Sequence, residues 1–470
     1  MRLVIKYGGT SMDEPGKIRD AAAFVASQGG EVVAVCSAAS GTTDNLMGIS
    51  GLIRKGDGKG ARAAADGIMR YTRELAEGAV SVEEDRERLS AALDGALAEL
   101  NGLIDGMALL GEVTPRSSDY LLSFGERLSS EILASAISER DRKAEALAGN
   151  EAGIVTDSNF GGARPLMDTT GLRVSKKIGG LLLEGVIPVV GGFVGADQYG
   201  RITTLGRGGT DYTATTVGAS IKADEIWLMS DMDGLMTANP RVVGGARVLD
   251  EVSYAEAVEM AMFGAKQIHP RTFEPLMGTR IPMRIRSAVN TGNPGTLVTA
   301  SPGPESGRTI KCVSALRHNA LIDIRGGGMV GEAGTAAGIF STLAGAGVNV
   351  MMISQNPSES SITVVIKKSD MDRAVDALEI GLAGKVIKKL EVTPDVAIVA
   401  LIGSGMRGTV GIASRVFGAA ASKGLNVVMI TQGSSELNLA FVVGDDDCWE
   451  AVRALHDEFG LGAPGGRAAG

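Results

Sequence analysis

The C-terminal part of the chain contains an internal repeat with an offset of 77 residues. The segment GGGMVG at 326–331 matches GSGMRG at 403–408 without a gap. The same offset relates four further pairs: Gly334 and Gly411, Phe340 and Phe417, Asn349 and Asn426, and Gln355 and Gln432. A gapless register over this distance indicates two copies of one structural unit. This part of the chain must therefore adopt a fold built from two similar halves.

Each copy has the pattern strand, glycine-rich turn, helix, strand, strand, helix. The first copy is predicted to add a strand at 386–392, whereas the second ends in a glycine- and alanine-rich tail after Gly460. Because the second copy lacks this last strand, the pattern suggests that the two copies share strands and do not stand fully apart.

Residues 1–300 alternate between short apolar runs and helical stretches with glycine-rich punctuation. The runs lie at 3–5, 31–35, 186–190, 226–229 and 283–285. This alternation predicts an α/β fold with a mostly parallel sheet and helices on both faces. Ligands of such sheets bind at the carboxyl ends of the strands. The glycine-rich segments described below all follow strands.

Residues 82–110 show a different, helical periodicity. Apolar residues recur there every three or four positions, at Leu89, Leu93, Leu97, Leu100, Ile104 and Met107. This spacing predicts one long helix with a single apolar stripe. The stripe would pack against its own domain or against a second subunit, and the sequence leaves both alternatives open.

Composition restricts the partners of the chain. Its 470 residues carry 46 Lys and Arg against 55 Asp and Glu, a net charge of −9, whereas nucleic-acid binding requires a basic surface. No apolar run reaches the roughly 18 residues of a membrane span, and no signal peptide precedes the strand at 3–5. The cysteines Cys36, Cys312 and Cys448 lie far apart and predict no zinc site. We expect a cytoplasmic protein without a protein-held metal, a nucleic-acid partner or membrane contact.

Two polar segments follow the first two strands. KYGGTS at 6–11 supplies Lys6 and two glycines whose N–H groups can approach phosphate oxygens, although it is no Walker A motif. SAASGTTD at 37–44 places small hydroxyl groups at a strand end. They would either cradle an anion or cap the following helix.

The segment TTLGRGGTD at 203–211 is the densest cluster of chemical groups. Arg207 offers a planar fork for a carboxylate or phosphate, and the flanking glycines let a ligand approach the backbone. Upstream, SFGERLS at 123–129 places Glu126 at a helix start. Taken alone, an exposed surface position would explain that glutamate equally well.

Further charged groups come later in the chain. SDMDG at 230–234 follows a strand and suggests nucleotide or metal contacts, or a simple turn. GAKQIHPR at 264–271 adds positive charge, and we interpret His269 as a structural turn residue. The positive and acidic groups together predict a kinase that binds a nucleoside triphosphate. These groups are Lys6, Arg207, Arg241 and Lys266, and Glu126, Asp211 and Asp231.

In this order, the motifs resemble those of the aspartate kinases of the amino-acid kinase family. The match covers nearly the whole chain and includes the longer segments TTLGRGGTDYTA at 203–214 and SDMDGLMTANPR at 230–241. The repeats look like the ACT units with which such enzymes sense an end-product amino acid. The resemblance implies a mostly parallel three-layer kinase sandwich followed by two ACT-type βαββαβ units. The implied domains are 1–300 with a helical insert at about 55–115, 310–393 and 394–470.

Such an enzyme would transfer the γ-phosphoryl group of ATP, with Mg²⁺, to the side-chain carboxylate of L-aspartate. The product, 4-phospho-L-aspartate, starts the route to lysine, threonine and methionine. By resemblance, the catalytic residues would be Lys6, Asp211 and Lys266. The nucleotide would be bound by Lys6, Gly8, Gly9, Ser37, Ser230, Asp231, Arg241 and Lys266. Aspartate would be bound by Thr43, Glu126, Arg207 and Thr210.

Within the aspartate site, Arg207 would bind the α-carboxylate and Glu126 the α-amino group. Three positions depart from the commonest family pattern. Thr210 replaces a serine and keeps the hydroxyl, whereas Asn239 replaces an aspartate and Met236 an occasional aromatic residue. The last two place the adenine-side contacts in doubt.

The resemblance further implies feedback regulation and a homodimer or homotetramer that pairs through the ACT units. The effector residues would be Met329, Gly334, Asn349, Met351, Gln355, Asn426 and Gln432. Lysine-sensitive relatives tend to carry an acidic residue near the position of Met351, so threonine is favoured over lysine as the effector.

Several alternatives remain at the level of the sequence. One is a kinase that acts on glutamate or acetylglutamate, and another is an amino-acid sensor whose kinase half is inactive. A dehydrogenase is disfavoured because no GxGxxG motif follows the first strand. Association with a separate homoserine dehydrogenase is left open.

Overall fold

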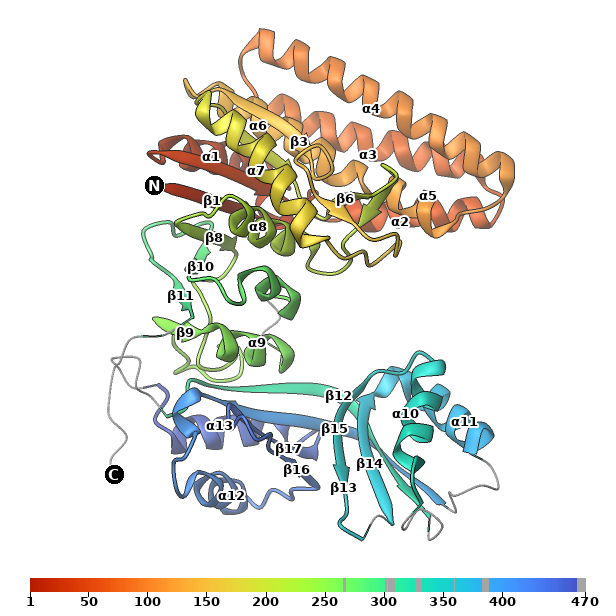
Figure 1. Ribbon diagram of the computed structural model, residues 1–470, viewed down its shortest axis with the longest axis vertical. Helices are drawn as coiled ribbons and strands as arrows, with labels where there is room; N and C mark the ends of the chain where they lie inside the picture. The colour runs from red at the N-terminus through yellow and green to blue at the C-terminus, as the bar shows by residue number, and fades with distance from the viewer. Residues whose placement is uncertain are drawn as a thin grey trace. The chain divides into compact units, whose positions relative to one another are not determined.

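The computed structural model describes residues 1–264, 268–300, 302, 309–326, 332–358, 360–382 and 389–462. The chain forms two compact units (Figure 1). The first unit contains Met1–Leu235, Asp250–Tyr254 and Gln267–Pro302, and the second contains Met236–Leu249, Ala255–Lys266 and Gly303–Gly470. Two segments expected within a 1–300 domain are therefore assigned to the second unit.

An eight-stranded sheet forms the centre of the first unit, in the order β3-β5-β2-β1-β8-β10-β11-β9. Its strands are β1 (Arg2–Tyr7), β2 (Glu31–Cys36), β3 (Ala144–Ala148), β5 (Ile187–Gly191), β8 (Glu225–Ser230), β9 (Glu251–Ser253), β10 (Met283–Ser287) and β11 (Thr296–Thr299). Every neighbouring pair is parallel except β10 and β11. The predicted mostly parallel sheet is thus confirmed. A small second sheet contains β4 (Val155–Thr156), β6 (Val194–Asp197) and β7 (Ile202–Thr204).

Helices cover both faces of the large sheet (Figure 1). They are α1 (Pro15–Ser27) and α6 (Phe124–Ser138) on one face, and α7 (Met167–Leu183) and α8 (Gly209–Ser220) on the other. Strand β1 shows the cause, because side chains alternate between the faces of a strand. Leu3 and Ile5 are buried with residues of α1 and α6. Val4 lies on the side of Gly218, in α8. Since both faces are covered, the middle of the strand, Leu3 to Ile5, is apolar and buried.

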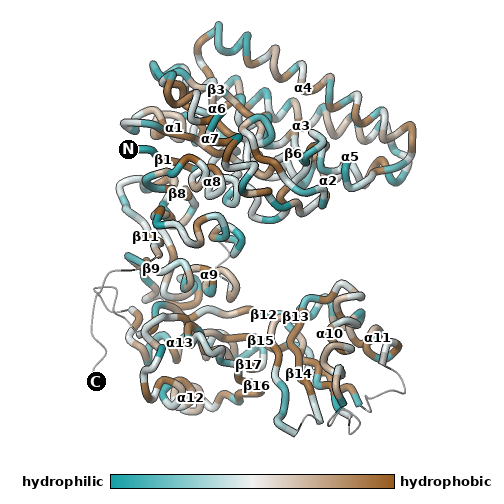
Figure 2. Tube along the Cα trace, viewed as in Figure 1, coloured by the Kyte–Doolittle hydropathy of each residue, from teal (hydrophilic) through white to brown (hydrophobic). Residues whose placement is uncertain are grey.

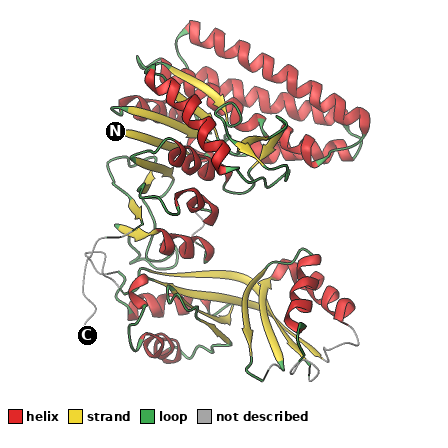
Figure 3. Ribbon diagram, in the orientation of Figure 1, coloured by secondary structure: helices red, strands yellow, loops and turns green. Residues whose placement is uncertain are grey.

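The helical insert predicted at about 55–115 contains α3 (Gly58–Ala79) and α4 (Glu83–Leu110), and it lies between α2 (Thr42–Arg54) and α5 (Pro115–Leu122). Helices are drawn red in Figure 3. Helix α4 confirms the helix predicted over 82–110. Hydrophobic and hydrophilic residues alternate along it in Figure 2. Leu89 and Leu93 are buried against α3 and α6, and Leu100 and Ile104 against α2 and α3. The stripe therefore packs within its own unit. None of the described helices has the length and hydropathy needed to cross a bilayer.

The second unit contains a six-stranded antiparallel sheet in the order β13-β14-β12-β15-β17-β16. Its strands are β12 (Cys312–Arg325), β13 (Val350–Gln355), β14 (Ser361–Lys367), β15 (Lys389–Ile402), β16 (Met429–Thr431) and β17 (Asn438–Gly444). Its helices are α9 (Tyr254–Met262, from its second residue), α10 (Thr335–Gly345), α11 (Met371–Leu382), α12 (Ile412–Ser422) and α13 (Cys448–Glu458). Strand β15 begins 77 residues after β12, and α12 begins 77 residues after α10. The repeat in the sequence is therefore a repeat of structure.

The strand predicted at 386–392 is confirmed over 389–392, but it does not end there, and 386–388 lie outside the described residues. Residues 389–392 belong to β15, which continues to Ile402 and pairs with the whole of β12. The register shifts between Leu316 and Leu321. His318 and Asp395, which lie 77 residues apart, both have positive φ angles, 62° and 58°. A bulge thus bends both strands without ending them, and the two copies form one sheet.

Candidate active site

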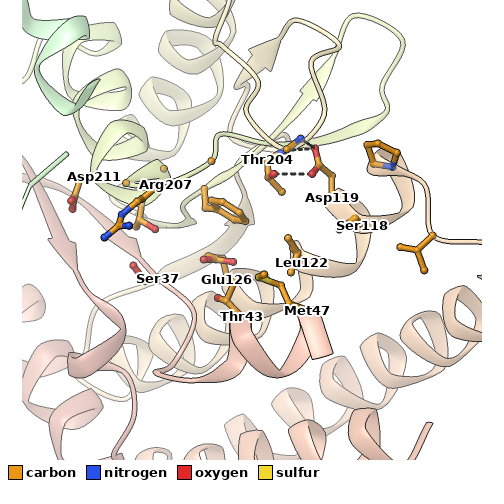
Figure 4. Close-up of a pocket in the computed structure, with 18 of the residues that line it drawn as sticks. Ser37, Thr43, Met47, Ser118, Asp119, Leu122, Glu126, Thr204, Arg207 and Asp211 are labelled. Carbon is orange, nitrogen blue, oxygen red and sulfur yellow. Dashed lines mark hydrogen bonds between the residues drawn. The ribbon is translucent and has the colours of Figure 1, made fainter. Parts of the chain in front are cut away.

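A cavity of about 670 Å³ lies in the first unit, beside the carboxyl ends of β1 and β2 and the N-terminus of α8. Its lining includes seven of the residues predicted to bind substrates: Lys6, Ser37, Thr43, Glu126, Arg207, Thr210 and Asp211. In Figure 4, Arg207 and Asp211 lie at one end of this cavity, Asp119 and Thr204 lie at the other, and Glu126 lies between them. Segments that are up to 205 positions apart in the sequence therefore meet in one place.

An ion pair marks the first end of the cavity. Lys6 Nζ lies 2.6 Å from Asp211 Oδ1, and the two side chains are only 13% and 12% exposed. Asp211 belongs to the first turn of α8, whose N-terminus favours anions. Gly208 precedes this helix with φ 73°, and a Cβ there would lie 2.4 Å from Cβ of His269. Only glycine fits this position, so the loop that carries Arg207 has a fixed course.

The Arg207 side chain is exposed at this end of the cavity. Among the described residues, no carboxylate lies within 4 Å of its guanidinium, which is therefore available to a ligand. The segment η2 (Pro270–Leu276) supports the loop, because Arg271 donates a hydrogen bond to the carbonyl of Leu205 at 3.0 Å. His269 caps η2 by accepting from the Arg271 N–H, which confirms its structural role. Burial lowers the pKa of His269.

Glu126 lies in the first turn of α6 and is only 4% exposed. The alternative of an exposed glutamate at a helix start is therefore wrong. Its Oε2 atom has no hydrogen-bond partner among the described residues. Burial raises the pKa of Glu126 to about 8. A buried carboxyl group without a cation is costly to ionise, so it favours a positively charged ligand group beside it.

Thr43 belongs to the first turn of α2 and lines the cavity. The N-cap of this helix is Gly41, in a left-handed conformation, and no side chain caps the helix. The hydroxyl groups of SAASGTTD therefore do not cap this helix.

Five predicted nucleotide-binding residues follow strand ends or close a strand: Gly8, Gly9, Ser37, Ser230 and Asp231. Strand β1 is parallel to both β2 and β8, so these ends share one edge of the sheet. Gly9 lies so close to the loop after β2 that a Cβ would be 2.7 Å from the carbonyl oxygen of Ala38. Ser37 lines the cavity, whereas Ser230 and Asp231 do not. Ser230 instead donates a hydrogen bond to Asp231 at 3.1 Å.

Three further nucleotide-side residues are not among the described residues that line the cavity. Met236, Asn239 and Arg241 belong to a segment of the second unit. Asn239 Oδ1 accepts a hydrogen bond from the N–H of Arg241 at 3.0 Å and so closes a turn. Lys266 lies outside the described residues.

The predicted effector residues are distributed over both repeats of the second unit. Gly334 precedes α10 with φ 93°, and its equivalent Gly411 precedes α12 with φ 90°. Met351 and Gln355 lie on β13, and Asn349 precedes it. Asn426 and Gln432 flank β16, and Met329 lies outside the described residues. Their role as effector contacts stays a prediction.

Among the cavity residues that the sequence did not predict is Asp119, in α5. Its side chain is buried and accepts three hydrogen bonds from Gly161 and Thr204. The sequence offers one weak signal, an acidic residue in a short helix just before SFGERLS.

Comparisons with known proteins agree with this arrangement. Residues 1–287 match the amino acid kinase family, and residues 322–380 and 399–459 match an ACT domain. Aspartokinase 3, chloroplastic, of Arabidopsis thaliana is 31% identical, over 97% of this chain and 81% of its own length. A chloroplastic bifunctional aspartokinase/homoserine dehydrogenase of Zea mays is 32% identical over 97% of this chain. The chain spans about half the length of such bifunctional relatives.

Solved structures give the same result for the fold. The crystal structure of E. coli aspartokinase III with aspartate and ADP, in the R-state, has a TM-score of 0.81 and 28% identity. The similarity covers 97% of this chain and 99% of that one. The same enzyme with lysine and aspartate, in the T-state, matches equally well. This chain therefore belongs to the amino acid kinase family, among its aspartokinases, and carries two ACT domains.

Proposed function

We propose that the chain is an aspartate kinase, which transfers the γ-phosphoryl group of ATP to the side-chain carboxylate of L-aspartate. The observation that carries the proposal is one cavity that combines the Lys6–Asp211 ion pair, the exposed Arg207 and the buried Glu126. The E. coli relative crystallised with aspartate and ADP supports the choice of substrates.

The amino acid would be recognised through its two backbone charges. Arg207 offers a fork of N–H donors that matches the α-carboxylate. Glu126 would accept from the α-ammonium, which would supply the cation that its burial lacks. The hydroxyl groups of Thr43 and Thr210 line the same cavity and would add neutral hydrogen bonds. Held in this way, the substrate would present its side-chain carboxylate to Lys6, whose partner Asp211 lies at the same end of the cavity as Arg207.

The chemical step would need no general base, because the side-chain carboxylate of aspartate is ionised at neutral pH. One of its oxygens would attack the γ-phosphorus, while the bond from that phosphorus to the bridging oxygen breaks and ADP leaves. Lys6, held by Asp211 at the start of α8, would stabilise the charge on the transferring group. Gly8, Gly9, Ser37, Ser230 and Asp231 would serve the nucleotide, together with Arg241 and the catalytic candidate Lys266.

Mg²⁺ enters this proposal as part of the MgATP substrate. Asp211 already engages Lys6, and the described residues include no group of three or more acidic, histidine or cysteine side chains suited to a metal ion. Mg²⁺ is commonly bound by the substrate phosphates with few protein ligands, which agrees with this donor set.

The finer expectations belong to the same proposal. The product would start the route to lysine, threonine and methionine in the cytoplasm. The ACT repeats would bind threonine as a feedback effector and pair two or four subunits. The E. coli relative was solved with lysine, so lysine is the effector to test beside threonine.

The deciding experiment is ATP turnover by the purified chain, with the acyl phosphate trapped by hydroxylamine. Aspartate and glutamate are compared as substrates, each with and without threonine or lysine. We expect hydroxamate with aspartate only, and less of it when threonine is added. Hydroxamate with glutamate alone would indicate a different amino-acid kinase, and no turnover would favour an amino-acid sensor. If neither threonine nor lysine changes the turnover, the repeats would serve only to assemble subunits.

A further inference from the structure

Asp119 carries a buried carboxylate in the wall of the cavity, with 1% of the residue exposed. Its Oδ2 atom accepts hydrogen bonds from the N–H of Thr204 at 2.8 Å and from the N–H of Gly161 at 2.9 Å. Its Oδ1 atom accepts from the hydroxyl of Thr204 at 2.8 Å. Figure 4 shows the two contacts with Thr204 as dashed lines.

The short helix α5 fixes where this carboxylate lies. Thr114 caps the helix by accepting a hydrogen bond from the N–H of Ser117, and Pro115 occupies the first turn. Both features are typical of a well-defined helix start. Burial raises the pKa of Asp119, and among the described residues no lysine, arginine or histidine lies within 4 Å of it. The negative charge of Asp119 is therefore stabilised by three hydrogen-bond donors, and the side chain in turn holds these donors in place.

The donors belong to two segments that form the far end of the cavity. Thr204 is the last residue of β7, and only Leu205 and Gly206 separate it from Arg207. The carbonyl of Thr204 also accepts from the N–H of Ala163 at 2.9 Å, so the turn at Gly161 is attached to β7 twice. Asp119 thus connects α5 with the start of the Arg207 loop and with this turn.

We infer that Asp119 is a positioning residue, which sets the place of Arg207 by anchoring the loop at Thr204. The inference rests on the proposed function, in which Arg207 binds the α-carboxylate of aspartate. A displacement of a binding group by about 1 Å can cost about 100-fold in rate, so an anchor three residues away is enough to matter. The competing role for Asp119 is direct contact with the substrate ammonium.

The test compares Asp119→Ala, Asp119→Asn and Thr204→Val by steady-state kinetics and by aspartate binding without ATP. In Asp119→Asn, the amide oxygen can accept both N–H groups and the amide nitrogen can donate to the Thr204 hydroxyl. We therefore expect Asp119→Ala to raise the KM for aspartate about tenfold or more, with a KM for ATP that changes little. Asp119→Asn should recover most of this loss, and Thr204→Val should show a smaller rise.

The matched control is Asp105→Ala, which removes an exposed carboxylate whose partner is Arg62. If Asp119→Asn raises the KM for aspartate as much as Asp119→Ala, the charge acts on the substrate and the positioning role is wrong. An unchanged KM in Asp119→Ala would also overturn it. If Asp119→Ala does not fold, the asparagine and valine variants still decide. Absence of aspartate-dependent turnover in the unmodified chain would instead defeat the proposed function.

Discussion

At one end of the cavity a cation and a carboxylate neutralise each other, whereas the carboxyl group in the middle is left without a cation. Lys6 and Asp211 form their ion pair with about an eighth of each side chain exposed. Glu126 is more deeply buried, and its Oε2 atom has no partner among the described residues. Arg207, in turn, is exposed and has no carboxylate partner among the residues that the structure describes.

This difference separates two tasks. A preassembled ion pair holds the lysine ammonium in place, as a site for phosphoryl transfer requires. The unpaired groups, one basic and one acidic, complement the carboxylate and ammonium of an amino acid. The paired groups, Lys6 and Asp211, would therefore act in phosphoryl transfer. The unpaired groups, Arg207 and Glu126, would bind the amino acid.

The largest effect is expected at the paired end. Lys6→Ala should lower kcat about 100- to 1,000-fold, because the charge that stabilises the transferring group is lost. The KM for aspartate should change far less. Steady-state kinetics with both substrates varied measures the two effects separately, and Lys17→Ala, a partly exposed lysine paired with Asp13 and Glu14, is the control. An equal loss of aspartate binding would remove the distinction between the two tasks.

For Arg207→Ala we expect the opposite pattern, a larger effect on the KM for aspartate than on kcat. Loss of a charge-assisted fork should raise the KM for aspartate about 10- to 100-fold, with a smaller fall in kcat. Arg207→Lys should recover only part of the affinity, because an ammonium lacks the planar geometry. Arg62→Ala, which removes an exposed arginine paired with Asp105, should leave both constants unchanged. A kcat that falls as far as in Lys6→Ala would assign Arg207 to phosphoryl transfer and not to aspartate binding.

Glu126→Gln should change the pH dependence of binding. The ammonium of the substrate requires an ionised carboxylate, so the KM for aspartate should fall as the pH rises toward about 8 in the unmodified chain. In Glu126→Gln the KM should be higher and this dependence lost. Isothermal titration with aspartate across this pH range is the direct measurement. Parallel pH profiles in the two proteins would show that Glu126 does not meet the ammonium.

The same residue predicts a pH effect on stability. Its pKa in the folded chain, about 8, lies above the value of about 4.3 for an unfolded glutamate. The folded state therefore holds the proton more tightly, and this stabilisation is complete below about 4.3 and is lost as the pH rises to about 8. The Tm of the unmodified chain should fall over this window relative to Glu126→Gln. A constant difference between the two Tm values would contradict the burial argument.

The smallest effect is expected for a neutral group of the same cavity. Thr43→Ala removes one hydroxyl and should raise the KM for aspartate about two- to tenfold, the usual range for a neutral hydrogen bond. Thr43→Ser should restore it, since the hydroxyl is kept. If the alanine variant loses as much affinity as Arg207→Ala, the charged groups do not dominate aspartate binding.

Much of this site could be predicted because its residues stand next to strand ends and helix starts. Lys6 is the last residue but one of β1, Arg207 belongs to a loop and Asp211 to the first turn of a helix. Local motifs therefore place all three at one edge of the sheet. Asp119 gave no comparable signal. Its contacts are with Thr204, 85 positions later, so the weak signal of an acidic residue in a short helix does not by itself distinguish it from a surface residue.

The fold shows the same limit. The 77-residue repeat predicted the matching elements of the second unit, because each copy repeats its own local pattern. The end of the first copy is different, because the sequence pattern predicted a strand that stops at Val392, whereas β15 continues to Ile402. Asp395 does adopt a positive φ, but within a bulge, and pairing with β12 carries the strand through it. Long-range pairing of this kind leaves no trace in a local pattern.

The continuous pairing of β12 with β15 also bears on aggregation. The outermost strands of the sheet, β13 and β16, contain six and three residues, so the hydrogen-bonding groups left open to other chains are few. A chain cut before β15 would instead expose β12 along all 14 residues. Long open strands of this kind recruit further copies edge to edge. Each ACT copy thus covers the long strand edge of the other through the pairing of β12 with β15. We therefore expect either copy alone to aggregate.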